Sequence, residues 1–481
     1  MQTYTDILIV GAGVVGCALA RELSLGCGAD VLVAERACDV AEGASKANSG
    51  IVHAGFDAKP GTEKARLNVE GARMYPELCR TLGVPYKQIG ALVVAFDEAD
   101  RTTLEKLLKQ GEQNGVSGLR IVEREELLQM EPSLNPAAVC ALEAPTSGIV
   151  SPYELVYALA DHAALNGASF LFDTEVEALI STEAGWRAVT ADGDILCRCV
   201  VNCAGIGSGK LHNQVSENQV ELVARRGQYD VLDHPEKPPF AHTMFQCPTK
   251  MGKGVLVTPT VHGNVLLGPT AEDIPDGRDV ATTAGGLADV AGKAQLTWPG
   301  MSLRTAVTNF SGIRAHEVNG DFIVGRAAPH CWEAVGFESP GLTSAPALAR
   351  EMTKAIIQEE GFGAKAETVP PQLRPRPFNE MTPEEQAEAV RRDPLNGQLI
   401  CRCEVVTEAE IVDAVHRPVP ALTIDAVKRR ILKLYREDIR KHAGRDALKV
   451  EAIFDELPSQ LRSQNRHFKL ASVEKGAEFS E

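Results

Sequence analysis

A glycine-rich turn near the start of the sequence could bind a dinucleotide. Gly11, Gly13 and Gly16 form a G-x-G-x-x-G pattern. In this pattern the first glycine permits a tight turn, the second lets the backbone approach a pyrophosphate, and the third lets the next helix pack closely. The N-terminus of that helix presents free N–H groups to the phosphates. Glu35, 24 residues after Gly11, could accept hydrogen bonds from the adenosine ribose hydroxyls and would repel a 2′-phosphate.

Two strands and a helix must position this turn. Residues 6–10 are a short apolar run that predicts a buried parallel strand, and residues 29–34 predict a second one. Residues 17–25 predict the helix between them. The order of strand, glycine turn, helix, strand and acidic residue indicates a Rossmann-like βαβ unit and not a turn without a ligand. The pattern alone does not distinguish NAD from FAD.

The segment 43–55 follows the second strand and is dense in small and hydroxyl-bearing residues. Such a loop can follow a flat, extended cofactor closely, and nicotinamide dehydrogenases do not usually need one here. Together with the glycine turn, it resembles the FAD-dependent oxidoreductases of the D-amino-acid-oxidase superfamily over about residues 1–360. The resemblance is nearest to the flavin-dependent glycerol-3-phosphate dehydrogenase and oxidase group, with the L-2-hydroxyglutarate oxidases as neighbours.

The resemblance implies FAD as the cofactor and a set of residues around it. These lie in the glycine turn, the 43–55 loop and two later turns: Gly11, Gly13, Gly16, Glu35, Ser45, Asn48, Ser49, Gly50, Gly205, Gly341 and Leu342. A helix that runs on from Gly341 to Ile357 would direct its N-terminus at the N1/C2 oxygen side of the flavin. That arrangement would stabilise an anionic reduced flavin.

Oxidation of an alcohol by a flavin needs a base for the hydroxyl proton and cations for the anionic end of the substrate. His53 is the predicted catalytic base, because histidine titrates near neutrality and the family places a histidine here beside flavin N5. Arg314 matches a family arginine that holds the substrate anion, and a guanidinium offers a planar fork for it. Lys253 is predicted to add positive charge. The alternatives are a purely structural role for His53 and a surface salt bridge for Arg314.

The implied reaction is oxidation of a small anionic secondary alcohol, foremost sn-glycerol 3-phosphate to dihydroxyacetone phosphate by hydride transfer to flavin N5. The sequence does not separate a phosphate from a carboxylate, so a 2-hydroxy acid such as L-2-hydroxyglutarate is the close alternative. An amine oxidase is a third possibility, and an electron-relay flavoprotein subunit belongs to another class. The electron acceptor (oxygen, a quinone or a partner flavoprotein) and the oligomeric state stay open.

We expect an α/β fold in which a Rossmann-like FAD-binding domain is interleaved with a substrate domain built on a mixed antiparallel sheet. Ser151 and Glu154 predict a capping box where one helix of the first domain begins. Four prolines between residues 369 and 378 indicate a linker. The expected ranges are 1–85, 145–220 and 315–360 for the FAD-binding domain, 86–144 and 221–314 for the substrate domain, and 361–396 for the linker.

A small helical appendage follows the linker. Residues 397–430 resemble the opening half of a bacterioferritin-associated-ferredoxin-like [2Fe-2S] domain, and Cys401 and Cys403 match its first ligand pair. A four-thiolate cluster needs a second pair, but no cysteine follows Cys403, so we expect no complete iron–sulfur cluster. Residues 431–481 resemble part of an unrelated group of AAA-type ATPases without a Walker motif. An unrelated helical tail is expected there, as a natural fusion or as an artefact near Arg430.

Composition excludes several classes of protein. The chain has 481 residues, 44% of them hydrophobic, and a net charge of −16, so it lacks the broad basic surface of a nucleic-acid binder. Residues 7–20 form an uncharged stretch that is too short to span a bilayer, and the first residues do not resemble a secretory signal. We expect a cytoplasmic protein, with peripheral attachment to the inner face of the membrane left open. Cys197, Cys199 and Cys203 are interpreted as buried side chains, and no metal site is predicted.

Overall fold

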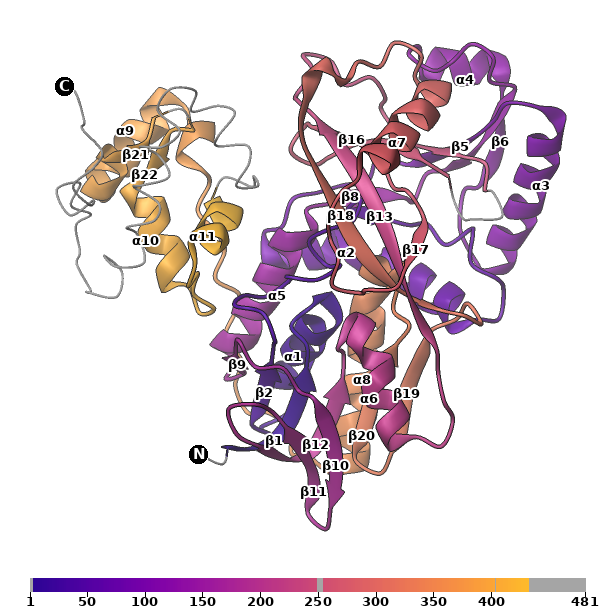
Figure 1. Cartoon of the computed structure of the whole chain (residues 1–481). Coiled ribbons are helices and arrows are strands. Elements are labelled where there is room, and N and C mark those ends of the chain that lie inside the picture. The colour runs from indigo at the N-terminus through magenta and orange to yellow at the C-terminus, as the bar shows by residue number, and fades with distance from the viewer. Residues whose placement is uncertain (1–2, 249–253, 403, 432–481) are drawn as a thin grey trace. The chain divides into compact units, whose positions relative to one another are not determined.

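The computed structural model describes residues 3–248, 254–402 and 404–431 (Figure 1). The chain divides into two compact units, residues 1–371 and residues 372–481. Each unit is described separately below. Among the residues described, no helix is long and apolar enough to cross a membrane.

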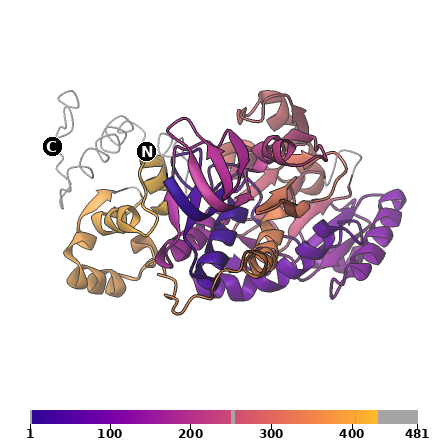
Figure 2. The same ribbon diagram turned by 90° about the horizontal axis from the view of Figure 1, so that it is seen from below.

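An eight-stranded sheet in the first unit carries the glycine turn. Its main path runs through β10 (Ala178–Thr182), β11 (Gly185–Val189), β12 (Ile195–Asn202), β1 (Thr3–Val10), β2 (Val31–Ala34) and β9 (Ser169–Leu171), and β20 (Cys331–Val335) and β19 (Ile323–Ala328) branch from β12. The strands from β9 through β1 to β12 and β20 are parallel. These strands lie side by side in both views (Figure 1 and Figure 2). Ile7, Leu8 and Ile9 are fully buried, as expected for a parallel sheet covered on both faces.

Five helices pack around this sheet or beside it. They are α1 (Val14–Gly26), α2 (Glu63–Leu82), α5 (Pro152–Leu165), α6 (Ser208–Val215) and α8 (Gly341–Glu360). Helix α1 contacts α5 and α8, and α8 also contacts α2. The strand, turn and helix predicted at the N-terminus are therefore confirmed.

The capping box predicted for α5 is wrong. Ser151 precedes the helix, but its side chain caps no backbone N–H. Glu154 instead accepts a hydrogen bond from His262, with 2.6 Å between Nε2 and Oε2. The carboxylate of Glu154 therefore binds a histidine far along the chain and does not form the local cap.

A second, mixed sheet has nine strands. In order they are β17 (Glu272–Ile274), β13 (Leu222–Leu232), β16 (Val265–Gly268), β15 (Leu256–Pro259), β14 (Thr243–Gln246), β5 (Ala91–Ala95), β7 (Cys140–Ala144) and β6 (Arg120–Glu123), with β18 (Ala306–Glu317) paired along β13. Neighbouring strands in this sheet pair antiparallel, except that β14 and β5 pair with each other in parallel. Helices α3 (Glu98–Gln113), α4 (Arg124–Met130) and α7 (Ala284–Thr297) accompany it. The two sheets draw their strands from the two sets of ranges expected for the two domains, except that β18 runs on to Glu317, past the expected boundary at residue 314.

A three-stranded sheet joins the loop 43–55, called the cofactor loop below, to the segment before α5. It consists of β3 (Ile51–Val52), β8 (Gly148–Val150) and β4 (Tyr86–Lys87). Ile51 pairs with Ile149, and the N–H of Val150 donates to the carbonyl of Gly50 at 2.8 Å. This pairing fixes where the 43–55 loop ends.

The second unit holds α9 (Pro383–Arg392), β21 (Leu399–Cys401), β22 (Val406–Thr407), α10 (Glu408–His416) and α11 (Ile424–Ile431). Thr407 and Glu410 form a capping box at the start of α10. Helix α9 lies inside the range 361–396 that was assigned to the linker. Thr382 and Glu385 form a second capping box there, and this spacing in the sequence is typical of the start of a helix.

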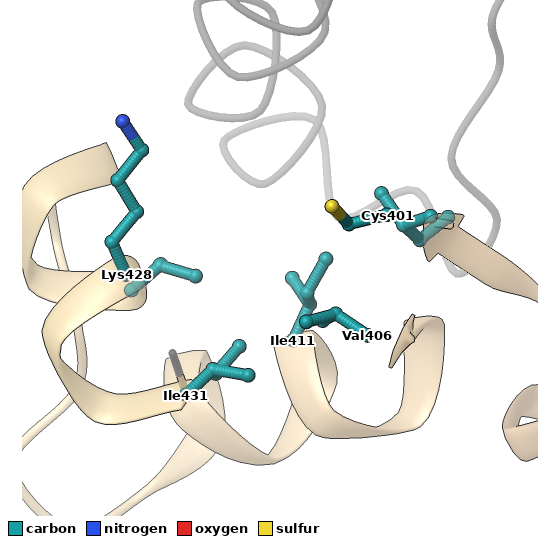
Figure 3. Close-up of a pocket in the computed structure, with 7 residues that line it drawn as sticks. Cys401, Val406, Ile411, Lys428 and Ile431 are labelled. Atoms are coloured by element: carbon teal, nitrogen blue, oxygen red, sulfur yellow. The ribbon is translucent and has the colours of Figure 1, made fainter. Parts of the chain in front are cut away.

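Cys401 lines a small, mainly apolar pocket in this second unit (Figure 3). Its side chain lies near Val406 and Ile411, and Lys428 and Ile431 line the other side. Cys403 and residues 432–481 lie outside the described residues. The expected ligand role of Cys403 and the expected helical tail therefore stay predictions.

Candidate active site

The glycine turn has the close contacts that its pattern predicts. Gly11 has a φ of +104°, and a Cβ at this position would lie 2.6 Å from the carbonyl oxygen of Cys203. A Cβ at Gly16 would lie 1.9 Å from the carbonyl oxygen of Gly11. Gly13 precedes α1 as its N-cap residue and provides no side-chain cap, and the Oγ of Ser45 accepts from the N–H of Val14 at 2.9 Å. The loop that carries Ser45 is thus held directly over the start of α1.

Glu35 lies at the end of β2, in front of the same turn. Its Oε2 accepts from the N–H of Ala12 at 2.7 Å, and its Oε1 accepts from the N–H of Ala37 at 3.0 Å. Burial raises the pKa of Glu35, although the two N–H donors pull the pKa back down. Because a carboxylate offers about four acceptor sites, each oxygen keeps room for a further donor such as a ribose hydroxyl.

Asn48 folds the cofactor loop onto itself. Its Nδ2 donates to the carbonyls of Ala44 and Ser45, both at 3.0 Å, and its Oδ1 accepts from the N–H of Gly50 at 2.8 Å. Both amide donors are therefore committed inside the loop, and Asn48 shapes the loop by these contacts. Ser49, its neighbour, is half-buried.

The N-terminus of α8 lies beside His53, which directly follows β3. The N–H of Gly341 donates to the carbonyl of Glu338 at 2.5 Å. The N–H groups of Leu342 and Thr343 fall in the first turn of the helix, where no carbonyl four residues back can accept from them. The hydroxyl of Tyr75 donates to the carbonyl of Leu342 at 2.6 Å, which anchors this turn to α2.

His53 is buried where these elements meet. Its N–H donates to the Oγ1 of Thr343 at 3.0 Å, and its carbonyl accepts from Asn68 at 3.1 Å. Its ring centroid lies 5.8 Å from that of Phe245, on β14 of the nine-stranded sheet. The predicted base is therefore clamped by two helices, with its ring beside the second sheet.

Arg314 lies on the face of β18 that contacts the cofactor loop. Side chains alternate along a strand, so Arg314 shares a face with Gly312, where a Cβ would lie 2.0 Å from the carbonyl oxygen of Ala47. The Nη2 of Arg314 donates to the carbonyl of Thr270 at 2.7 Å. Its Nε is buried and makes no hydrogen bond to any described residue. No carboxylate among the described residues forms an ion pair with the guanidinium of Arg314.

A neighbouring arginine shows the contrast. Arg225 lies directly opposite Arg314 in the strand register, but its guanidinium binds Asp273, with 2.6 Å between Nε and Oδ1. The positive charge of Arg225 is therefore compensated, whereas that of Arg314 is available for an anion.

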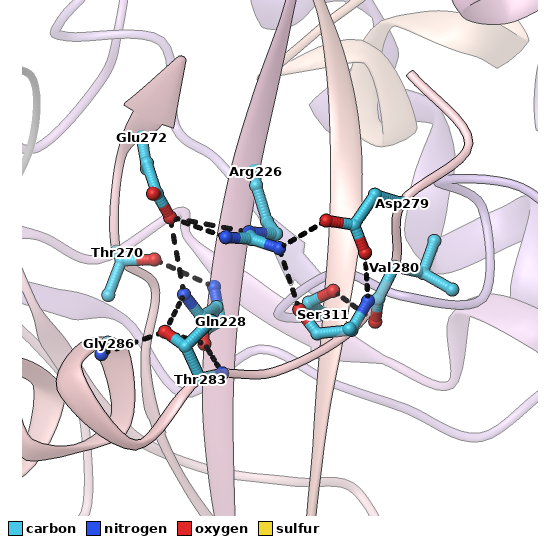
Figure 4. A network of polar contacts seen from close by, with 10 residues as sticks. Arg226, Gln228, Thr270, Glu272, Asp279, Val280, Thr283, Gly286 and Ser311 are labelled. Carbon is cyan, nitrogen blue, oxygen red and sulfur yellow. Dashed lines mark hydrogen bonds and ion pairs between the residues drawn. The ribbon is translucent and has the colours of Figure 1, made fainter. Parts of the chain in front are cut away.

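The opposite face of the same two strands carries a closed polar network (Figure 4). Arg226 is buried between Glu272, at 2.9 Å, and Asp279, at 3.0 Å. Gln228 accepts from the N–H of Thr283 at 2.6 Å and so reaches the start of α7. The charges of Arg226, Glu272 and Asp279 compensate one another, so this network offers no second anion site. Its hydrogen bonds hold the loop before α7 in place.

Two predicted residues stand apart from these contacts. Gly205 follows β12 with a φ of +57°, and a Cβ there would meet no atom within 4 Å, so this turn faces open space. Lys253 lies outside the described residues. Sequence reasoning missed Asn68, Tyr75 and Thr343, which hold the site through long-range contacts that no local pattern signals.

The family model for FAD dependent oxidoreductases, named DAO, matches residues 6–355. The chain belongs to the DAO family of FAD dependent oxidoreductases. This confirms the expected fold class and the expectation of a flavoenzyme.

Several relatives of this DAO-family enzyme are known. It is 44% identical to a glycerol 3-phosphate dehydrogenase from Caloramator mitchellensis over 435 residues, which cover 89% of each chain. It is 32% identical to a glycerol 3-phosphate oxidase from Mycoplasma pneumoniae, over 73% of this chain and 94% of the other. A solved structure of L-alpha-glycerophosphate oxidase from Mycoplasma pneumoniae with FAD bound superimposes with a TM-score of 0.73 and 30% identity. That match covers 78% of this chain and 99% of the other.

The residues of this DAO-family enzyme fit FAD. The close-packed glycine turn, the carboxylate of Glu35 and the first-turn amides of Leu342 and Thr343 offer complementary groups to a pyrophosphate, a ribose and an electron-rich ring. Cys197, Cys199 and Cys203 are buried, in agreement with their interpretation as core side chains. No group of three or more His, Cys, Asp and Glu side chains that could hold a metal occurs in the described part of the chain.

Proposed function

We propose that this flavoenzyme oxidises sn-glycerol 3-phosphate to dihydroxyacetone phosphate. The observation that carries the proposal is Arg314, a cation without a carboxylate partner among the described residues, on the strand face that contacts the cofactor loop. The similarity to proteins named glycerol 3-phosphate dehydrogenase and glycerol 3-phosphate oxidase supports phosphate as the anion.

The substrate is oriented by its anionic end. Arg314 donates a pair of hydrogen bonds to the phosphate, in the planar fork geometry that a guanidinium provides. Lys253 adds a second positive charge. With the phosphate fixed, the secondary alcohol is directed at the flavin and at His53.

His53 accepts the hydroxyl proton. The carbon-bound hydrogen then leaves with its electron pair as a hydride, and the carbon–oxygen bond becomes the carbonyl of dihydroxyacetone phosphate. FAD supplies the hydride acceptor, its N5 atom. The hydrogen bonds of Thr343 and Asn68 to the backbone N–H and carbonyl of His53 fix the main chain from which the imidazole extends.

The cofactor residues divide by the part of FAD that they bind. Gly11, Gly13 and Gly16 would hold the pyrophosphate, and Glu35 would hold the adenosine ribose. Ser45, Asn48, Ser49, Gly50, Gly205, Gly341 and Leu342 would line the rest of the cofactor. The electron acceptor for a bound flavin would be oxygen, a quinone or a partner flavoprotein. A quinone acceptor would bring the enzyme to a membrane surface.

Anaerobic mixing with a panel of alcohols tests the substrate. We expect sn-glycerol 3-phosphate to bleach the oxidised-flavin absorbance at least ~10-fold faster than L-2-hydroxyglutarate, and glycerol, which has no anion for Arg314, to leave it unchanged. Bleaching by L-2-hydroxyglutarate alone would assign a carboxylate to the site. A flavin that dithionite reduces but no alcohol in the panel reduces would favour the electron-relay alternative.

A further inference from the structure

Glu338 binds a lysine and a histidine from two other elements. Its Oε1 accepts from the Nζ of Lys64 at 2.9 Å and lies 3.0 Å from the Nδ1 of His316. The side chains of Lys64 and Glu338 are each only 13% exposed. This is a nearly enclosed cluster and not a surface ion pair.

The two partners lie on two different elements, His316 on β18 and Lys64 on α2. His316 lies two residues after Arg314 on β18, so alternation places both on the same strand face. Lys64 lies in the first turn of α2, where Asp321 caps the N–H groups of Glu63 at 3.1 Å and Lys64 at 2.9 Å. The cluster therefore connects the strand of the substrate arginine to the start of α2.

Glu338 is also coupled directly to the start of α8. Its carbonyl accepts from the N–H of Gly341 at 2.5 Å, and the neighbouring Phe337 stacks on Phe322 with 4.1 Å between ring centroids. Lys64 lies over Phe322 as well, 5.2 Å from the ring centroid. The segment that leads into α8 is thus fixed by its backbone, an aromatic stack and an ion pair.

The carboxyl group of Glu338 is ionised at neutral pH. Burial raises its pKa, but Lys64 and His316 more than offset this, so the pKa lies below the usual value for a glutamate. A largely buried carboxylate persists only where cations compensate it. Loss of either partner would therefore disturb the whole cluster.

We propose that Glu338 is a positioning residue that holds the FAD-facing N-terminus of α8 in register with the Arg314 strand. The inference rests on the proposed function, which assigns FAD to the first element and the substrate anion to the second. A merely structural alternative is that Glu338 only ties α2 to α8.

An ion pair that joins α2 to α8 itself separates these interpretations. Arg66 of α2 binds Glu351 of α8, with 2.7 Å between Nη1 and Oε1, at a more exposed position. Glu351→Gln is therefore a matched control, because it removes an α2–α8 ion pair that touches neither β18 nor the segment before α8.

The test compares Glu338→Gln with Glu351→Gln in the full-length protein. FAD affinity is measured without substrate, by titration of the apoprotein with FAD. We expect Glu338→Gln to raise the FAD dissociation constant about 10-fold and to slow anaerobic flavin reduction at saturating substrate by about 10-fold, from loss of a charge-assisted contact. We expect Glu351→Gln to change each by less than about twofold, as an exposed pair should.

Lys64→Gln provides a second route if Glu338→Gln does not fold. It should weaken FAD binding in the same direction, and the double variant should lose no more than Glu338→Gln alone, because both substitutions break one cluster. Additive losses, wild-type FAD affinity in both single variants, or equal losses from Glu338→Gln and Glu351→Gln would overturn the proposal. Because FAD affinity is measured without substrate, failure of sn-glycerol 3-phosphate to reduce the flavin would contradict the proposed function and leave this result standing.

Discussion

Gly227 and Gly312 lie directly opposite each other on β13 and β18, and together they form a patch without side chains. A Cβ on Gly312 would lie 2.0 Å from the carbonyl oxygen of Ala47, and a Cβ on Gly227 would lie 3.3 Å from the Nη2 of Arg314. The glycine pair therefore lets the cofactor loop and the substrate arginine approach the same strip of sheet. This explains how two distant segments of the chain reach one site.

Gly312→Ala should displace the cofactor loop. The backbone carbonyl of Ala47 cannot yield as a flexible side chain would, so we expect FAD to bind at least ~10-fold more weakly, a loss of about 1.4 kcal/mol or more. Titration of the apoprotein with FAD measures this. Gly285→Ala, where a Cβ would meet no atom within 4 Å, is the matched control and should bind FAD like the wild type. Unchanged FAD affinity in Gly312→Ala would contradict the contact.

Arg314→Ala should remove the substrate anion contact. Loss of a bidentate, charge-assisted contact costs roughly 2–4 kcal/mol of transition-state binding, or about 30- to 1000-fold in kcat/KM. Steady-state kinetics with sn-glycerol 3-phosphate measure this effect. Arg225→Ala, which removes an arginine already paired with Asp273, should cost less than Arg314→Ala. An effect of Arg314→Ala below about threefold would place the anion elsewhere.

His53→Ala should slow flavin reduction by roughly 10²-fold or more, because a general base contributes on this scale. Stopped-flow mixing under anaerobic conditions measures the rate directly. The variant should also lose the pH dependence that a histidine base imposes on the reaction. Retention of both the wild-type rate and its pH dependence would assign the proton to another acceptor.

Glu338 should make stability depend on pH. Because its pKa is lowered in the folded protein, its contribution is present above the pKa of an unfolded glutamate, about 4.3, and is lost as the pH falls through the folded value. Thermal unfolding should therefore show a higher Tm for the wild type than for Glu338→Gln at pH 7. The difference should shrink progressively below about pH 4. A constant difference across this range would show that ionisation of Glu338 does not stabilise the fold.

The C-terminal unit should carry no complete [2Fe-2S] cluster. Cys401 and Cys403 supply two of the four thiolates that such a cluster needs, and no cysteine follows them in the sequence. Anaerobically purified protein should contain FAD without stoichiometric iron and acid-labile sulfide. Stoichiometric amounts of both would show that other ligands complete the cluster.

Local patterns predicted the parts of the site that are local in sequence. The glycine turn, Glu35 and the first strands follow from periodicity and spacing, because a βαβ unit is built from neighbouring residues. The contact of Glu338 with Lys64, 274 residues away, has no such signature. Glu154 shows the same limit, because its partner His262 lies far along the chain and replaced the predicted local cap.

The most direct test of the proposed function is the stoichiometry of one anaerobic turnover. Each mole of enzyme-bound FAD that is reduced by sn-glycerol 3-phosphate should yield one mole of dihydroxyacetone phosphate, and Arg314→Ala at the same substrate concentration should react far more slowly. Flavin that is not reduced by sn-glycerol 3-phosphate, or is reduced without formation of dihydroxyacetone phosphate, would contradict the account.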